Sequence, residues 1–221
     1  MIPLSDVIPS RTKPVVTVGL IVVNAVVFLY QLMLPEPALQ VFVGRYALIP
    51  AWFSVPALFT SQFLHGGWMH VISNMLYLWI FGDNVEDRLG HVPFLIFYLG
   101  AGAAAALLQT LFNPFSSVPM LGASGAIAGV MGAYFVLYPQ SRVLTLIFLF
   151  IFVDIVEIPA IFFLGIWFLM QLLSGVGSLG VSNAAGGGVA FWAHIGGFVA
   201  GLLIGVVLRA RGPRRWDEAY H

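Results

Sequence analysis

The sequence contains no cysteine and few charged side chains. Without cysteine, the chain forms no disulfide, no thiolate metal site, no iron–sulfur cluster and no cysteine nucleophile. Asp, Glu, Lys and Arg make up 8% of its 221 residues, against roughly 25% in soluble domains. The nine basic and nine acidic residues cancel, so the chain lacks the basic surface that nucleic-acid binding requires. With 60% hydrophobic residues, the composition excludes a soluble domain and indicates an integral membrane protein.

Six apolar stretches are long enough, once flanking residues are included, to cross a bilayer core of about 30 Å, which takes around 20 helical residues. They cover residues 14–34, 68–81, 92–112, 121–138, 158–173 and 189–208. We therefore predict an all-α membrane protein: a six-helix domain over residues 14–208, with a long external loop between its first two helices. An N-terminal segment, 1–13, precedes this domain, and a basic tail, 209–221, follows it.

The apolar run 143–153 is too short to cross the membrane and is closed by Asp154 and Glu157. We predict an interfacial segment here, with Pro159 opening the fifth helix. The alternative is one long span with two buried acids, a pattern typical of proton relays.

Six crossings place both termini on one side of the membrane. Eight of the nine basic residues then fall on the terminal side: Arg11, Lys13, Arg88, Arg142, Arg209, Arg211, Arg214 and Arg215. Because basic residues concentrate in cytoplasmic segments, we predict cytoplasmic termini. The short tails favour a bacterial inner (plasma) membrane. Arg45 alone falls in the external loop, 35–67, where Pro50 and Pro56 are expected to limit regular structure. That loop either lies partly in the membrane interface or forms a packed external cap.

Four polar side chains lie near the outer ends of three predicted helices. His70 and Asn74 belong to the second helix, Ser124 to the fourth and His194 to the sixth. At 1.5 Å per residue, each lies within roughly 10 Å of the outer boundary. Because unpaired polar groups are costly in lipid, we expect them to share a water-filled cavity open to the outside.

Glycines repeat on two of these helices in a pattern that favours close packing. The fourth carries Gly125, Gly129 and Gly132, and the sixth carries Gly197, Gly201 and Gly205. Small residues let membrane helices approach closely, so the two glycine faces are expected to bring Ser124 against His194. Ordinary packing is a sufficient role for Gly201 and Gly205.

The paired residues suit acyl transfer. His194 is the candidate base that takes the proton of the Ser124 hydroxyl. No carboxylate is placed to orient His194, so we predict a dyad rather than a triad. His70 and Asn74 lie one turn apart and, with the Ser124 amide, supply donors for an oxyanion. His65 is expected to satisfy loop backbone at the entry of its helix.

The chain lacks the residues that other classes of membrane protease require. No H-E-x-x-H motif is present, which leaves zinc binding by His65, His70 and His194 as a weaker alternative. Asp154 is the one aspartate near membrane depth, whereas an aspartyl protease needs two. We predict an intramembrane serine endopeptidase with no cofactor and no metal.

The motifs resemble those of the rhomboid family of intramembrane serine proteases, over about residues 14–208. The similar stretches are His65-Gly-Gly-Trp-Met-His70-Val-Ile-Ser-Asn74-Met75, Glu86-Asp87-Arg88-Leu89-Gly90, Gly122-Ala-Ser124-Gly125-Ala126 and Ala193-His194-Ile-Gly196-Gly197. The resemblance implies six helices and cleavage of single-span membrane proteins near the outer leaflet. It also implies Ser124 as nucleophile, His194 as base, His70 and Asn74 as oxyanion donors, and structural hydrogen bonds by Glu86.

Two features depart from the family pattern. A Trp-Arg pair common in the first external loop has no counterpart, Gly44-Arg45-Tyr46 being the nearest stretch. Some members carry an aromatic residue four positions after the serine, stacked on the base, where this chain has Ala128. The competing function is that of an inactive relative that binds transmembrane helices, but the chain retains both Ser124 and His194.

Overall fold

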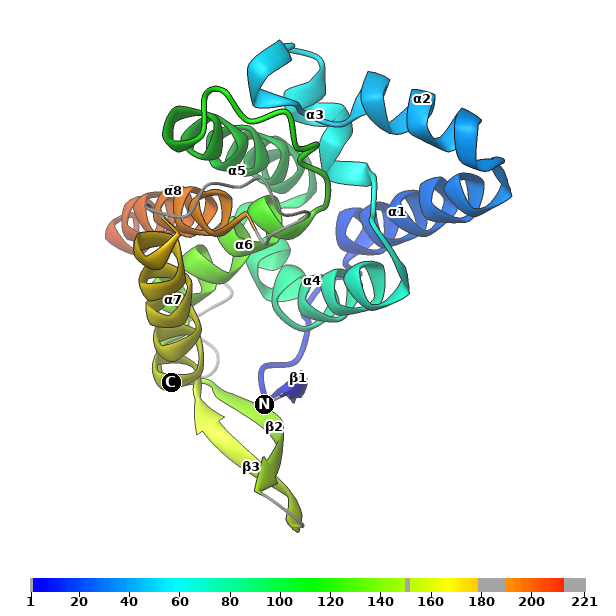
Figure 1. Cartoon of the computed structure of the whole chain (residues 1–221). Helices are drawn as coiled ribbons and strands as arrows, with labels where there is room; N and C mark the ends of the chain where they lie inside the picture. The colour runs from blue at the N-terminus through cyan, green and yellow to red at the C-terminus, as the bar shows by residue number, and fades with distance from the viewer. Residues whose placement is uncertain (1, 150–151, 179–189, 213–221) are drawn as a thin grey trace.

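The computed structural model describes residues 2–149, 152–178 and 190–212, which form a mostly helical bundle (Figure 1). The long helices are α1 (Val15–Met33), α4 (Trp68–Leu89), α5 (His91–Phe112), α6 (Ser124–Leu137), α7 (Ala160–Gly177) and α8 (Phe191–Ala210). Each overlaps one predicted span. Residue 189, at the start of the sixth, and Arg214 and Arg215 of the tail lie outside the described residues.

Four of these helices, α1, α5, α7 and α8, are long and apolar enough to cross a membrane. The other two differ for separate reasons. Helix α6 is shorter, with 14 residues, and α4 is polar at both ends, from His70 near its start to Arg88 near its end. Within the residues that the structure describes, four helices are therefore able to span, and the count of six stays a prediction.

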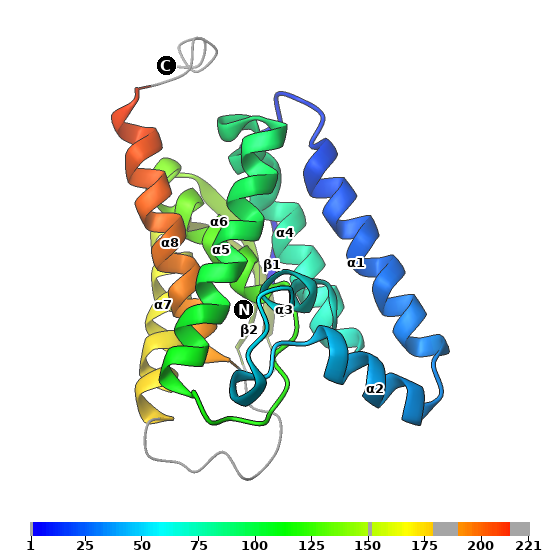
Figure 2. The same cartoon turned by 90° about the horizontal axis from the view of Figure 1, so that it is seen from above.

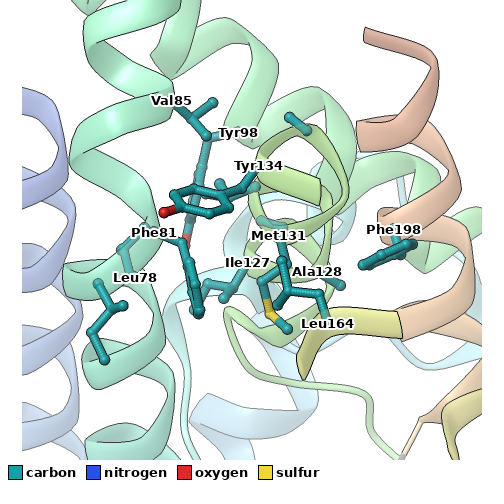
Figure 3. Close-up of a cluster of buried hydrophobic side chains, with 14 of the residues drawn as sticks. Leu78, Phe81, Val85, Tyr98, Ile127, Ala128, Met131, Tyr134, Leu164 and Phe198 are labelled. Atoms are coloured by element: carbon teal, nitrogen blue, oxygen red, sulfur yellow. The ribbon is translucent and has the colours of Figure 1, made fainter. Parts of the chain in front are cut away.

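Helix α6 lies at the centre because its residues are small. Every residue from Gly125 to Tyr134 is buried, and α6 contacts α4, α5, α7 and α8. Figure 2 shows α8, α5, α4 and α1 side by side. Larger side chains pack against one another beside these small residues. The ring centroids of Phe81 and Tyr134 lie 5.0 Å apart in an edge-to-face arrangement (Figure 3).

The glycines of α6 and α8 bring the two backbones into direct contact. A Cβ atom at Gly197 would collide with the carbonyl oxygen of Gly125, and one at Gly201 with that of Gly129. Close backbone approach of this kind is how small residues associate helices in lipid. The predicted contact between the two glycine faces is present.

Short helices fill most of the segment 35–67. They are α2 (Glu36–Tyr46), α3 (Ala57–Thr60) and two 3₁₀ turns, η1 (Pro50–Trp52) and η2 (Ser61–Phe63). The expectation that proline limits regular structure here is wrong, because Pro50 is the first residue of η1 and Pro56 directly precedes α3. Proline has a fixed φ and no N–H, so it suits the start of a helix.

Helix α4 runs further than expected. Asp83, Glu86 and Asp87, which follow the predicted span 68–81, lie in its last turns, and Gly90, at φ +87°, ends the helix. Glu86 is fully buried and accepts hydrogen bonds from the backbone of Val16 at 2.9 Å and of Thr17 at 2.7 Å. The first amides of a helix have no partner within it, so this carboxylate caps α1 and fastens it to α4.

A three-stranded antiparallel sheet interrupts the helical fold. Its order is β1 (Ile2–Asp6), β2 (Arg142–Leu149) and β3 (Phe152–Pro159), and the β2–β3 hairpin projects from the bundle (Figure 1). The all-α prediction is wrong here because the run is rich in the β-branched and aromatic residues that favour strands. The alternative of one long helical span is wrong too, since Asp154 and Glu157 lie in β3. Pro159 does precede α7, as predicted.

The first strand is also tied to α6 by a carboxylate. Asp6 Oδ2 accepts a hydrogen bond of 2.5 Å from the Tyr134 hydroxyl, which also lies 2.8 Å from Ser141 Oγ. Burial raises the pKa of Asp6 from its ordinary 3.8 to about 6, and the negative charge of Asp83 acts in the same direction. The folded protein therefore holds a proton on Asp6 at a pH at which the unfolded chain has released it.

This difference predicts that stability falls as pH rises from about 4 to about 6. The contribution should be at most about 2 kcal/mol, because Asp6 is only partly buried. Thermal unfolding in detergent between pH 4 and pH 7 measures it, and Asp6→Asn should flatten the slope. Asp154→Asn, an exposed carboxylate of the same sheet, is the control and should leave the slope in place. Equal slopes in wild type and Asp6→Asn would remove Asp6 as the cause.

Candidate active site

Ser124 and His194 meet where α6 and α8 begin. Ser124 is the first residue of α6, and His194 lies in the first turn of α8. The serine Oγ lies 2.9 Å from His194 Nε2, within hydrogen-bond range of a nucleophile and its base. Gly125 lets the start of α6 pack closely against α5, since a Cβ there would lie 2.6 Å from that of Ala105.

The other ring nitrogen of His194 has a partner that the sequence reasoning missed. Its Nδ1 lies 2.8 Å from Oε1 of Gln171 on α7. An amide oxygen only accepts, so this contact is a hydrogen bond when Nδ1 carries the proton, and Nε2 can then accept from the serine. The sequence did contain a signal for this contact, because Gln171 is a lone amide side chain in an otherwise apolar helix.

Helix α7 also supplies an aromatic neighbour to the base. The indole of Trp167, one turn before Gln171, lies 5.7 Å from the His194 ring at an interplanar angle of 37°. Ala128, at the position where some family members carry an aromatic residue, is fully buried. The aromatic contact to the base therefore comes from a different helix.

His70 and Asn74 face the segment that leads to Ser124. Gly122, at φ +123°, has its Cα so close to His70 that a Cβ would lie 2.6 Å from the ring Nε2 and 3.7 Å from Asn74 Nδ2. Glycine is required here both by this contact and by the positive φ. The structure thus brings the four predicted polar residues of α4, α6 and α8 to one end of the bundle; the water-filled cavity between them stays a prediction.

The ring of His65 has a different role from the one expected, because it contacts a side chain of α4. Its buried ring places Nε2 3.0 Å from Asn74 Nδ2, so it accepts from the amide and orients it. The main chain of His65 is held in turn by Gln31, which accepts from His65 N at 3.0 Å and donates to His65 O at 3.1 Å. The backbone role expected of His65 falls to Gln31, because α1 packs beside this loop.

Carboxylates lie away from the base in the part of the chain that the structure describes. The partners of the two ring nitrogens of His194 are Gln171 and Ser124, while Asp154 and Glu157 lie in β3, beyond the other end of α6. Within the described ranges, no three His, Asp or Glu side chains gather into a metal site. The arrangement suits nucleophilic attack by an activated serine.

Comparison with known proteins identifies the family. A family model described as the Rhomboid domain matches residues 52–211, a range that includes both Ser124 and His194. The chain belongs to the rhomboid family. With four helices able to span a bilayer, this rhomboid is an integral, multi-pass membrane protein.

Several curated relatives carry the rhomboid name. The chain is 31% identical over 199 residues to Rhomboid protein 1, mitochondrial, of Saccharomyces cerevisiae, covering 85% of this chain and 51% of the relative. It is 32% identical over 166 residues to Rhomboid-like protein 11, chloroplastic, of Arabidopsis thaliana, covering 74% and 53%. It is 42% identical over 76 residues to Rhomboid protease GluP of Bacillus subtilis, covering 34% and 14%. This rhomboid spans about half or less of the length of these relatives.

Proposed function

We propose that this rhomboid is an intramembrane serine endopeptidase that hydrolyses peptide bonds in or near the transmembrane segments of membrane proteins. The observation that carries the proposal is the 2.9 Å contact between Ser124 Oγ and His194 Nε2. A polar pair at a helix start in a membrane protein is costly to maintain and so tends to be functional.

The reaction follows from this geometry. Ser124 Oγ attacks the carbonyl carbon of the substrate while His194 Nε2 takes its proton. The oxyanion of the tetrahedral intermediate accepts hydrogen bonds from the Ser124 amide, His70 and Asn74. The C–N bond then breaks, the amine leaves with the proton from His194, and an acyl-enzyme remains. Water, deprotonated by His194, hydrolyses this ester and returns the serine.

We further propose six crossings with both termini on the cytoplasmic side. The pairing of β1 with β2 holds the N-terminal segment and residues 142–149 on one side, so the number of crossings between them is even. Helices α1 and α5 are long enough to cross. For the total to be even, α4 and α6 must then either both cross the membrane or both not cross it. Arg88, at the end of α4, donates to the carbonyl of Leu208 at 2.7 Å and so keeps the end of α8 on this side.

This topology places the dyad near the opposite, outer face of the bacterial inner membrane. Single-span proteins that cross beside the bundle would present a peptide bond at that depth. A transmembrane helix hides its peptide bonds, so substrates with glycine or proline near their outer end should be favoured.

Fluorophosphonate labelling of the purified protein tests the proposed function. The probe should label wild type at Ser124, and the label should vanish in Ser124→Ala. Co-expression with a panel of tagged single-span proteins should yield cleavage products with wild type and none with Ser124→Ala. A folded wild type that neither labels nor cleaves, yet retains tagged helices on purification, would instead indicate the inactive helix-binding function.

A further inference from the structure

The base of the dyad is supported by a helix that contributes nothing else to the site. Two side chains of α7 reach His194: Gln171, through Oε1 at 2.8 Å from Nδ1, and Trp167, through ring contact at 5.7 Å. The flanking residues Leu169, Met170 and Leu173 are exposed on the outer surface of the bundle. An amide in such a helix needs a hydrogen-bond partner, and the imidazole supplies it.

The position of that amide decides which ring nitrogen carries the proton. A neutral imidazole has one N–H, and an acceptor fixed beside one nitrogen holds the proton there. With the proton on Nδ1, Nε2 presents a lone pair to the serine hydroxyl. With the proton on Nε2, the same ring could not accept from serine. In Ser-His-Asp enzymes a buried carboxylate holds the tautomer in this way.

Resting on the proposed function, we propose that Gln171 is a positioning residue, which fixes the tautomer and orientation of His194 in place of the carboxylate of a triad. A neutral amide accomplishes this without placing a charge at membrane depth, where a carboxylate is expensive. The contact with Gln171 also explains how His194 stays aligned although Ala128 stands where some family members carry an aromatic residue stacked on the base.

The surroundings of His194 allow this role to be isolated. Among the residues that the structure describes, the titratable group that acts on it electrostatically is His70 on α4, while α7 contacts it with the neutral side chain of Gln171. Gln109 Oε1 accepts from the amide of Ala193 at 3.1 Å. Gln109 is therefore a matched amide, which touches the same helix start but not the imidazole.

The test compares variants that keep or remove the acceptor at nearly constant volume. Gln171→Glu keeps an oxygen acceptor whether or not it is ionised, and should retain kcat within about threefold. Gln171→Met removes the acceptor and should lower kcat roughly tenfold, the effect of one hydrogen bond, with KM unchanged. Gln109→Met, the control, should leave kcat above that of Gln171→Met. Wild-type kcat in Gln171→Met, or equal losses in Gln171→Met and Gln171→Glu, would reduce Gln171 to a packing residue and overturn the proposal.

A spectroscopic measurement reads the tautomer in the wild-type protein, with one variant used only to assign the signals. In protein labelled with ¹⁵N-histidine, the wild-type signals that disappear in His194→Ala should show a protonated Nδ1 and an unprotonated Nε2. The reverse assignment would overturn the role of Gln171, even in an active enzyme. If the proposed function fails instead, wild type itself shows no cleavage that depends on Ser124. The two failures are therefore distinct.

Discussion

Replacing either Ser124 or His194 by alanine is expected to slow peptide-bond cleavage by about a thousandfold or more, and replacing both should slow it no further. The serine hydroxyl is a weak nucleophile without a base, and the base has no task without the hydroxyl 2.9 Å away. Residues that act as one unit lose their effect together. The residual rate would come from the oxyanion donors and from substrate binding, which the three variants share.

Single-turnover cleavage of a reconstituted single-span substrate measures this effect. Ser73→Ala is the matched control, because Ser73 is exposed on α4 and its hydroxyl donates to the carbonyl of Met69 in its own helix. This control should cleave at close to the wild-type rate. A double variant slower than either single variant by the product of their losses would mean that the two residues act independently, and would contradict the dyad.

Gly201→Ala is expected to destabilise the protein by about 3 kcal/mol or more, through overpacking that its surroundings cannot relieve. The added methyl would collide with the carbonyl oxygen of Gly129, and both backbones are held in helices. Separation of α6 from α8 would also lengthen the contact between Ser124 and His194, so activity should fall with stability.

Gly100→Ala on α5 is the control for the stability measurement. It makes the same substitution in a membrane helix, at a position with open space around the new methyl. In an exposed helical position this change is worth roughly 0.5–1 kcal/mol in favour of alanine. Unfolding in mixed detergent micelles should therefore separate the two variants clearly. Equal stability of the two would show that α6 and α8 need no backbone contact.

The main features of the site could be predicted from the sequence because they depend on spacing along single helices. His70 and Asn74 share a face because they lie one turn apart, and Ser124 and His194 share a depth because each opens a helix. The glycines of α6 and α8 indicated which faces meet. Gln171 could not be placed in this way, because its contact with His194 depends on the rotation of α7 about its axis, which an apolar pattern does not fix.

The remaining differences between the prediction and the structure arise where one sequence pattern is compatible with two structures. Short apolar runs such as 143–153 suit a strand or a helix equally, and here pairing with β1 decides. Asp83, Glu86 and Asp87 look like a cytoplasmic loop by charge, yet Glu86 is drawn into the fold because it caps the start of α1. Such contacts join distant segments, so the sequence does not show which backbone groups the carboxylate reaches.

The pairing of β1 with β2 has a consequence for biosynthesis. Residues 2–6 leave the ribosome well before their partners, Val143 to Leu146, which follow only after α1, α4, α5 and α6 have been made. Contacts that join distant parts of a chain form late, because closing the intervening loop costs entropy. The sheet therefore closes only after these four helices have been made, and β1 stays unpaired until Val143 to Leu146 have emerged.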